Sequence, residues 1–255
     1  MKPLGAYTAV IGEGAALYAD ALAALCAGVI LLPPCASLDP RVASHPDMLL
    51  ALPGERCIVP AQYAAQPCAS RALAALEHAA GARIESSPYP IGGSYPADIG
   101  YNVLLCGDIL CGLLPHVSPD VLRAARETGL RTVSVKQGYA GCSTLVCGEL
   151  AVTADPSVRA ALAQEGVPVF SLPPGGVSLA GYSCGFIGGA SGYAADTAVF
   201  FGDPALHPRG AALCAELERR NIAVYALSGA PLCDFGGIRF IKNRADGCRK
   251  RLCVI

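Results

Sequence analysis

The chain has 255 residues, a length at which one large hydrophobic core or two smaller ones are both feasible. Hydrophobic residues make up 53% of it and charged residues only 15%, which excludes a disordered chain and indicates a compact body with much buried surface. Because 19 Lys and Arg face 20 Asp and Glu, the net charge of -1 provides no field to attract a phosphate backbone, and we expect no nucleic-acid partner.

The first 35 residues are rich in Ala, Leu and Val and superficially resemble a signal peptide or a membrane span. Glu13 and Asp20 interrupt this run, and glycines divide it into a strand over 8–12, a helix over 14–27 and a strand over 29–32. We therefore expect a soluble, uncleaved, cytoplasmic protein that has no contact with a membrane.

A strand-strand-helix-strand unit begins at residue 47. Apolar runs over 47–52 and 57–60 predict two strands, and a helix capped by Ser70 is expected to end at Gly81. Residues 83–85 then predict a third strand. Two strands before the helix distinguish this unit from the single strand that precedes each helix in an ordinary open parallel sheet.

The same order returns in three further units. Their helices carry clear signals, because Ser118 and Asp155 each precede a proline in the first turn, and Gly129, Gly166 and Asn221 mark the ends. The expected helices cover 118–129, 155–166 and 208–220. The expected strands cover 101–106 and 132–135, then 142–147, 151–153 and 167–172, then 185–189, 198–203 and 222–227.

A fifth unit is divided between the two ends of the chain. Residues 233–238 predict its opening strand, and the elements already assigned to 8–32 supply the remainder. A unit shared by both ends closes a ring and leaves no exposed sheet edge. We therefore predict one α/β domain over 1–255, a five-bladed propeller with pseudo-fivefold symmetry. Its units are 47–98, 99–141, 142–182, 183–232, and 233–255 joined to 1–46; an open parallel sheet is the alternative.

If the units superpose, the residues before each first strand meet at the axis. Polar groups gathered at the mouth of an apolar body are what a small-molecule site requires. The alternative is that polar residues precede strands simply because loops are polar. The residues concerned are Asp47, Tyr101 with Asn102, Cys142 with Ser143, Gly185 with Phe186, and Asp234.

His45 and Asp47 form the first candidate pair within this ring. A histidine and a carboxylate at a strand entrance suit a general base and an anchor for a cationic group. Asp234 is a second carboxylate that can pair with a guanidinium or ammonium group. The alternative interpretation makes His45 a loop residue and both aspartates turn formers.

A second candidate segment covers residues 136–143. It brings Lys136, Gln137, Tyr139, Cys142 and Ser143 together, a high density of polar side chains for a chain with few charges. A neighbouring Lys136 would lower the pKa of the Cys142 thiol and make it a nucleophile. The alternative is that Cys142, one of 13 cysteines, is an inert packing residue.

Neither a metal nor a cofactor is expected. The cysteine count is odd and no Cys-x-x-Cys occurs, so we expect reduced thiols and no zinc site. The glycine-rich run 188–192 has no following Gly-Lys-Ser/Thr, so we interpret it as tight turns. The basic cluster at the end of the chain, from Arg239 to Arg251, predicts a solvated tail.

Four strings of residues resemble those of an uncharacterised bacterial family assigned to the guanidino-group-modifying enzyme fold, also called the pentein fold. They are 45–48, 136–140 followed by Cys142 and Ser143, 185–192, and 234–238. The resemblance spans nearly the whole chain. It implies a five-bladed α/β propeller, which agrees with the repeat.

The resemblance implies that a guanidino or amine-bearing substrate enters the axial pore. Enzymes of this fold, such as arginine deiminase, use a Cys near the C-terminus, a His in mid-chain and acidic residues that hold the guanidinium. This chain departs from that pattern, because His45 is early and no His-x-Glu stands in mid-chain.

We therefore expect Asp47 and Asp234 to hold the cation, with Asn102, Lys136, Gln137, Tyr139 and Ser143 lining the site. His45 would transfer protons, and Cys142 or Cys233 would attack the amidine carbon. The alternative is a non-catalytic binding or scaffolding protein. The oligomeric state stays open.

Overall fold

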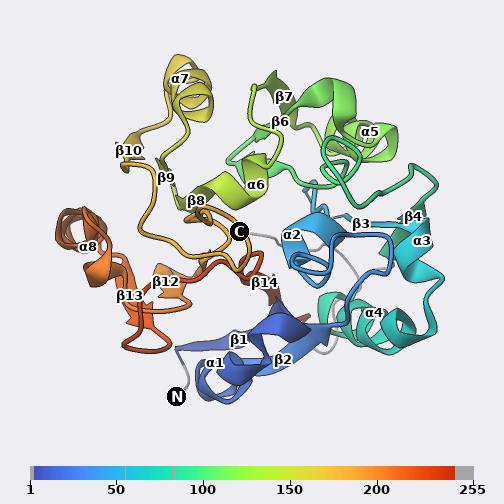
Figure 1. The fold of residues 1–255 in the computed structure, drawn as a ribbon, viewed down its shortest axis with the longest axis horizontal. Coiled ribbons are helices and arrows are strands. Elements are labelled where there is room, and N and C mark those ends of the chain that lie inside the picture. The colour runs from blue at the N-terminus through green and yellow to red at the C-terminus, as the bar shows by residue number, and fades with distance from the viewer. Residues whose placement is uncertain (1–2, 55, 82–83, 245–255) are drawn as a thin grey trace.

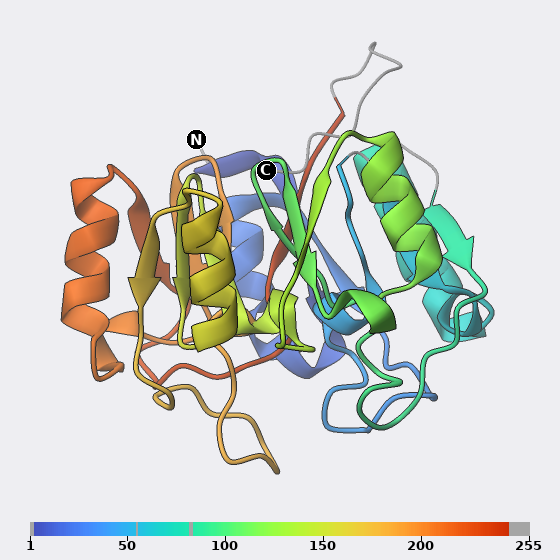
Figure 2. The same cartoon turned by 90° about the horizontal axis from the view of Figure 1, so that it is seen from above.

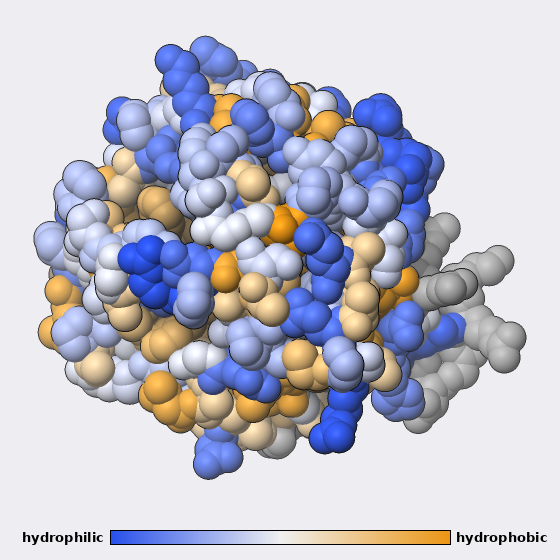
Figure 3. All heavy atoms as spheres, turned by 45° about the vertical axis from the view of Figure 1, so that its right-hand side comes forward, coloured by the Kyte–Doolittle hydropathy of each residue, from blue (hydrophilic) through white to orange (hydrophobic). Residues whose placement is uncertain are grey.

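Five separate sheets surround a common centre in the computed structural model, which describes residues 3–54, 56–81 and 84–244. Figure 1 shows the sheets arranged about the middle of the molecule, with helices α1, α4, α5, α7 and α8 at its periphery. On the face drawn in Figure 3, hydrophilic and hydrophobic residues are interspersed. Within the described residues, no helix is long and apolar enough to cross a membrane.

Three of the sheets repeat one topology. In the first, β5 (Leu104–Cys106) pairs antiparallel with β6 (Ile109–Gly112), and β7 (Arg131–Ser134) joins β6 in parallel after η2 (Leu114–His116) and α5 (Pro119–Glu127). The other two follow the same order. They consist of β8 (Thr144–Cys147), β9 (Leu150–Thr153), α7 (Pro156–Gln164) and β10 (Val169–Ser171), then β11 (Ser191–Ala194), β12 (Thr197–Phe200), η3 (Pro204–Leu206), α8 (Gly210–Arg219) and β13 (Ala223–Ala226).

Capping residues fix where these helices begin and end. The side chains of Ser118 and Asp155 accept hydrogen bonds from backbone N–H groups of the first turns of α5 and α7, as the sequence predicts. Gly129, Gly166 and Asn221 follow the helices with positive φ. Glycine adopts this conformation without strain, and Asn is among the residues that tolerate it best.

Strands from the two ends of the described chain pair in one sheet. Strand β14 (Arg239–Lys242) pairs antiparallel with β1 (Leu4–Gly12), and β2 (Cys26–Leu32) pairs parallel with β1 after η1 (Glu13–Tyr18) and α1 (Ala19–Leu25). The expected opening strand over 233–238 is wrong, because these residues form a loop and the strand begins at Arg239. Residues 245–255, with Cys248, Cys253 and half of the expected basic cluster (Arg249, Lys250 and Arg251), lie outside the described residues.

The unit that begins near residue 47 departs most from the expected pattern. Strands β3 (Cys57–Pro60) and β4 (Ile84–Ser87) pair in parallel on either side of α3 (Ala61–Ala64) and α4 (Pro67–Ala80). In place of a strand over 47–52 there is a short helix, α2 (Pro46–Leu49), followed by a single bridge between Ala51 and Ile58. A short apolar run cannot by itself distinguish a strand from a helical turn, and Pro46 at the first helical position favours the turn.

The helix α4 also begins earlier than expected. It starts at Pro67, so Ser70 lies inside it and is not its cap. Its end at Gly81, which has φ 63°, agrees with the prediction.

Polar residues before the first strands lie in turns and not in the strands themselves. Strand β5 begins at Leu104, two residues after Asn102, and β8 begins at Thr144, after the single-turn helix α6 (Ala140–Ser143) that carries Cys142. The first strands pack side by side, β5 with β8, β8 with β11 and β11 with β14. The turns that precede them therefore converge on the centre of the molecule.

Candidate functional site

The central site starts with Asp47, which α2 directs into the interior. Pro46 opens this helix, and the backbone N–H of Asp47 donates to Gly236 O at 3.3 Å, which ties α2 to the loop before β14. The Asp47 side chain is only 1% exposed. Its Oδ1 atom is buried and has no hydrogen-bond partner among the described residues. This oxygen is an open acceptor in the middle of the protein.

Asn102 links the unit of β5 to the turn of α6. Its Oδ1 accepts hydrogen bonds from the backbone N–H of Gly141 at 2.8 Å and of Cys142 at 3.3 Å. Its Nδ2 donates to Cys142 Sγ at 2.9 Å and to Met48 Sδ at 3.3 Å. A fully buried amide whose donors and acceptors are all engaged fixes the position of its neighbours. Asn102 therefore orients the thiol of Cys142.

The thiol of Cys142 completes this cluster. Its Sγ donates to Asp47 Oδ2 at 2.7 Å while it accepts from Asn102. Burial raises the pKa of the thiol well above its ordinary value, and the charges of Asp47 and Asp234 raise it further. The expectation that Lys136 lowers this pKa is wrong, because desolvation dominates and Lys136 is exposed beyond β7.

The carboxyl group of Asp47 titrates near neutrality. Burial raises its pKa to about 7, against the positive charge of Arg239, which lowers it. A carboxylate with a pKa in this range both accepts and returns protons near neutral pH. In the resting pair the shared proton therefore resides on the sulfur, and Asp47 Oδ2 is positioned to accept it when the sulfur attacks a substrate.

Asp234 occupies a comparable position in the loop before β14. Its Oδ1 accepts from Gly236 N and its Oδ2 from Phe186 N, both at 2.9 Å. Burial raises the pKa of this carboxyl to about 6, and the two backbone N–H groups limit the rise. Asp234 has the polar partners that Asp47 lacks.

His45 faces Asp234, with its Nδ1 3.8 Å from Asp234 Oδ1. The imidazole is 6% exposed, and burial lowers its pKa to about 4. The side chain is therefore neutral at neutral pH, which suits a proton acceptor better than a cation.

Two glycines allow the backbone to approach Asp234 and His45 closely. A Cβ on Gly189 would lie 2.0 Å from Asp234 Oδ1, and one on Gly236, which has φ 79°, would lie 2.3 Å from the Cβ of His45. The glycine-rich run 188–192 therefore lets the backbone lie close to the Asp234 carboxylate, and it is not a phosphate-binding loop.

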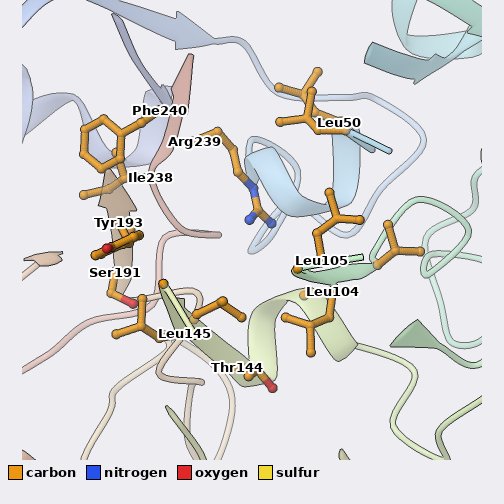
Figure 4. Close-up of a pocket in the computed structure, with 18 of the residues that line it drawn as sticks. Leu50, Leu104, Leu105, Thr144, Leu145, Ser191, Tyr193, Ile238, Arg239 and Phe240 are labelled. Atoms are coloured by element: carbon orange, nitrogen blue, oxygen red, sulfur yellow. The ribbon is translucent and has the colours of Figure 1, made fainter. Parts of the chain in front are cut away.

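A cavity of about 390 Å³ opens beside this cluster. Figure 4 shows the guanidinium of Arg239 pointing from β14 into it, towards α2. Gly141 and Gly188, which lie next to Cys142 in space, form part of its wall. The assignment of Arg239 to a solvated tail is therefore wrong, since it belongs to a strand and lines the cavity.

Within the described part of the chain, the remaining expected residues form no hydrogen bond with the thiol. Gln137 and Ser143 line a separate cavity of about 180 Å³, where Gln137 donates to Asp155 at 2.8 Å. Tyr139 donates to Asp98 Oδ2 at 2.7 Å. Cys233 is half-buried in a bridge with Ser178, and its neighbour Asp234 points to the centre in its place.

Sequence reasoning missed Asp98 altogether. This carboxylate is 6% exposed, its Oδ1 has no hydrogen-bond partner among the described residues, and burial raises its pKa. Tyr139 packs between the rings of Tyr95 and Phe186, at centroid distances of 5.9 and 6.2 Å. The density of tyrosines and prolines around residue 95 was the one signal that could have identified this region.

The described part of the chain contains no group of three His, Cys, Asp or Glu side chains able to hold a metal ion. The chemistry available at the centre is that of a thiol, two carboxylates, an amide, an imidazole and a guanidinium. These groups suit proton transfer and nucleophilic attack.

Comparisons with known proteins give a family and a fold. Residues 13–239 match the family described as "Family of unknown function (DUF6873)". No curated protein matches the chain. Among solved structures, dimethylarginine dimethylaminohydrolase in an adduct with S-methyl-L-thiocitrulline is 12% identical, with a TM-score of 0.56, over 87% of this chain and 92% of that one.

A second such structure is the enzyme from Pseudomonas aeruginosa, a cysteine-to-serine mutant complexed with citrulline. It is 11% identical, with a TM-score of 0.55, over 89% of this chain and 93% of that one. At this identity the similarity shows the fold alone. The chain shares the mixed α/β fold of these hydrolases, the pentein fold.

Proposed function

The chain belongs to the DUF6873 family, and from this premise we propose that it is a guanidino-group-modifying hydrolase that uses Cys142 as its nucleophile. One observation carries the proposal: Cys142 Sγ lies 2.7 Å from Asp47 Oδ2, and the other oxygen of that carboxylate has no partner among the described residues. We further propose that the five units form one cytoplasmic domain, closed as a five-bladed propeller.

The open oxygen of Asp47 matches the hydrogen-bonding needs of a guanidinium. A guanidinium N–H bonded to Oδ1 would place its carbon near the adjacent sulfur, which is the alignment that nucleophilic attack requires. The charges of the centre also suit a cation. When both are ionised, the carboxylates of Asp47 and Asp234 outnumber the guanidinium of Arg239 by one, and a singly charged cationic substrate balances this excess.

The first chemical step would join sulfur to carbon. As Sγ attacks the guanidinium carbon, the thiol proton passes to Asp47 Oδ2, along the hydrogen bond that already exists. Asp47 then returns this proton to the departing nitrogen as the C–N bond breaks and ammonia or an amine leaves. A carboxyl group with a pKa of about 7 suits both transfers at neutral pH.

The second step would restore the thiol. Water attacks the carbon of the thiouronium intermediate and gives up one proton. As the C–S bond breaks, the second proton of this water passes through Asp47 Oδ2 to Sγ, a ureido product leaves, and the first proton is released to solvent. We assign the acceptance of a proton from this water to His45, which is neutral at neutral pH and held beside Asp234. Asn102 keeps the sulfur in place throughout.

The loop side of the axis is the more favourable entrance for a cation. Figure 2 shows the loop between β10 and β11 at the lower edge of the molecule, opposite the hairpin turns of β5–β6 and β8–β9. Tyr139, Phe186 and Asp98 belong to this lower region, and aromatic faces and carboxylates attract guanidinium groups. On the opposite side, Arg239 would repel a free cation.

The similar structures agree with this substrate class. One is named a dimethylarginine dimethylaminohydrolase, and the two complexes contain S-methyl-L-thiocitrulline and citrulline. The proposal transfers the class of reaction to this chain and not a particular substrate.

A non-catalytic binding protein is the second candidate, and the burial of the centre favours it. Cys142 is 4% and Asp47 1% exposed, so substrate must displace part of the loop side to reach them. A closed centre of this kind also serves as a structural polar cluster.

Turnover assays with arginine, agmatine and methylated arginines test the proposal. We expect release of ammonia or an amine with at least one of them. Replacement of Cys142 by Ser should reduce the rate by about a thousandfold or more, because the weaker nucleophile cannot form the intermediate. Cys68→Ser, at an exposed thiol, is the matched control and should leave the rate unchanged.

Two results would reject the hydrolase. Turnover that survives Cys142→Ser removes the covalent mechanism. Absence of turnover with every guanidino compound, together with measurable binding of one of them, supports the binding protein.

A further inference from the structure

The cavity beside Arg239 has walls unlike those of the thiol cluster. Its lining is largely apolar, and at about 390 Å³ it has the size of a small-ligand site. It lies on the hairpin side, since Gly107 and Gly148 from the turns of β5–β6 and β8–β9 belong to its wall. The main apolar contributions come from Leu50, Leu52, Leu105, Leu145, Ile238 and Phe240.

The hydroxyl groups of this wall already have partners. Ser191 Oγ donates to Ile187 O at 2.6 Å, and Tyr193 OH donates to Asp196 Oδ1 at 2.9 Å. Thr144 Oγ1 lies 3.2 Å from Ser143 Oγ. None of these groups therefore requires a ligand.

Arg239 differs from them. It is the one charged residue among those that line the cavity, and within the described chain its guanidinium forms neither a hydrogen bond nor an ion pair. A guanidinium carries five N–H donors in a planar fork, and Arg239, which is only partly buried, presents this fork to the cavity without a protein acceptor. The positive charge of Arg239 lowers the pKa of Asp47, yet no ion pair joins the two side chains.

We propose that this cavity binds an organic monocarboxylate with an apolar body, whose carboxylate pairs with Arg239 and whose hydrocarbon part packs on the leucines. Guanidinium and carboxylate match in bidentate geometry, and removal of apolar ligand surface from water adds affinity. This cavity lies on the hairpin side of the thiol cluster, with Gly141 and Gly188 in its wall, and it would take a ligand of opposite charge to the guanidino substrate. Binding of a carboxylate at this cavity does not depend on turnover, so the proposal holds even if the chain is not a hydrolase.

Calorimetric titration of the full chain with hexanoate tests the proposal. We expect saturable binding at millimolar concentrations or below. Hexan-1-ol and hexylamine, which lack the negative charge, and inorganic phosphate, which lacks the apolar body, should each bind at least about tenfold more weakly. These probes separate the contributions of charge and of hydrocarbon.

The variant Arg239→Gln should weaken hexanoate binding by about tenfold or more, while Arg239→Lys, which keeps the charge but not the fork, should lose less. Arg126→Gln, at an exposed arginine of α5, is the matched control and should bind like the unaltered chain. If Arg239→Gln does not fold, hexanoate binding by Arg239→Lys and the relative affinities of the four probes for the unaltered chain still test the proposal. Equal binding of hexanoate and hexan-1-ol, undiminished binding in a folded Arg239→Gln, or no saturable binding of millimolar hexanoate would overturn the proposal.

Discussion

The carboxylates at the centre and those at the rim of the molecule behave in opposite ways. At the rim, Arg41 lowers the pKa of Asp39 to about 2, and Arg219 and Arg220 do the same to Glu216, both in contact with water. At the centre, burial raises the pKa of Asp47 to about 7. Ionisation of the rim carboxylates does not lower the free energy of unfolding, whereas ionisation of Asp47 does. Groups held in such unfavourable environments concentrate at functional sites.

The centre itself contains two unequal carboxylates. Asp234 has two backbone N–H donors and Asp47 has a thiol and an open oxygen. Both oxygens of Asp234 accept hydrogen bonds from the protein, whereas Asp47 Oδ1 has no hydrogen-bond partner among the described residues. Substitutions at the centre should therefore change the free energy of unfolding more than the same kind of substitution at the rim.

Replacement of Asp47 by Asn should change the pH dependence of stability. The unfolded chain releases the Asp47 proton near 3.8 and the folded chain near 7, so the free energy of unfolding falls as pH rises between these values. Asn cannot ionise and escapes this loss. The stability of the variant relative to the original chain should therefore increase by about 4 kcal/mol from pH 4 to pH 8. Denaturant unfolding across this range measures it.

Glu216→Gln is the matched control at the rim. Because Glu216 is ionised in both states above its ordinary range, this variant should show no pH-dependent difference between pH 5 and 8. A flat difference for Asp47→Asn would contradict the account of the central carboxylate.

The two regions should also respond differently to a single added methyl group. In Gly189→Ala the new Cβ would lie 2.0 Å from Asp234 Oδ1 and would displace this carboxylate from its hydrogen bonds. We expect a loss of about 3 kcal/mol or more in the free energy of unfolding. At the rim, Gly129→Ala meets no atom within 4 Å and strains only the positive φ of 80°, so its loss should be about 1 kcal/mol.

Equal losses for the two variants would show that the packing around Asp234 is not tight. The positive φ of Gly129 penalises alanine at the rim only, so a larger loss at Gly189 must come from the contact with Asp234.

The repeat could be predicted from the sequence because its signals are local. Ser118 and Asp155 cap their helices, and Gly129 and Gly166 end them, in the order that the pattern indicates. The divided unit followed from counting strands before each helix. The short turns could not be predicted, because the apolar run after Pro46 fits a strand and a helical turn equally well.

The site was only partly accessible to sequence reasoning. The expectation that residues before the first strands meet at the axis agrees with the contacts among Asp47, Asn102 and Cys142 and with the effect of Asp234 on the thiol, although Asp47 lies in helix α2 and precedes no strand. It did not identify which of them touch, and proximity in sequence misassigned Lys136 to the thiol. Arg239 was lost among the basic residues that follow it, because only the pairing of β14 with β1 shows that it belongs to a strand beside the cavity.

The central claim is that Cys142 is a nucleophile beside an open acceptor for a cation. Alkylation by 2-chloroacetamidine, which carries a positive charge, and by neutral 2-chloroacetamide, followed by peptide mass spectrometry, tests it most directly. The ratio of the two rates at exposed Cys68 gives the intrinsic reactivity. At Cys142 we predict a ratio at least about tenfold larger, because Asp47 attracts the cation. The same ratio at both cysteines would contradict the account.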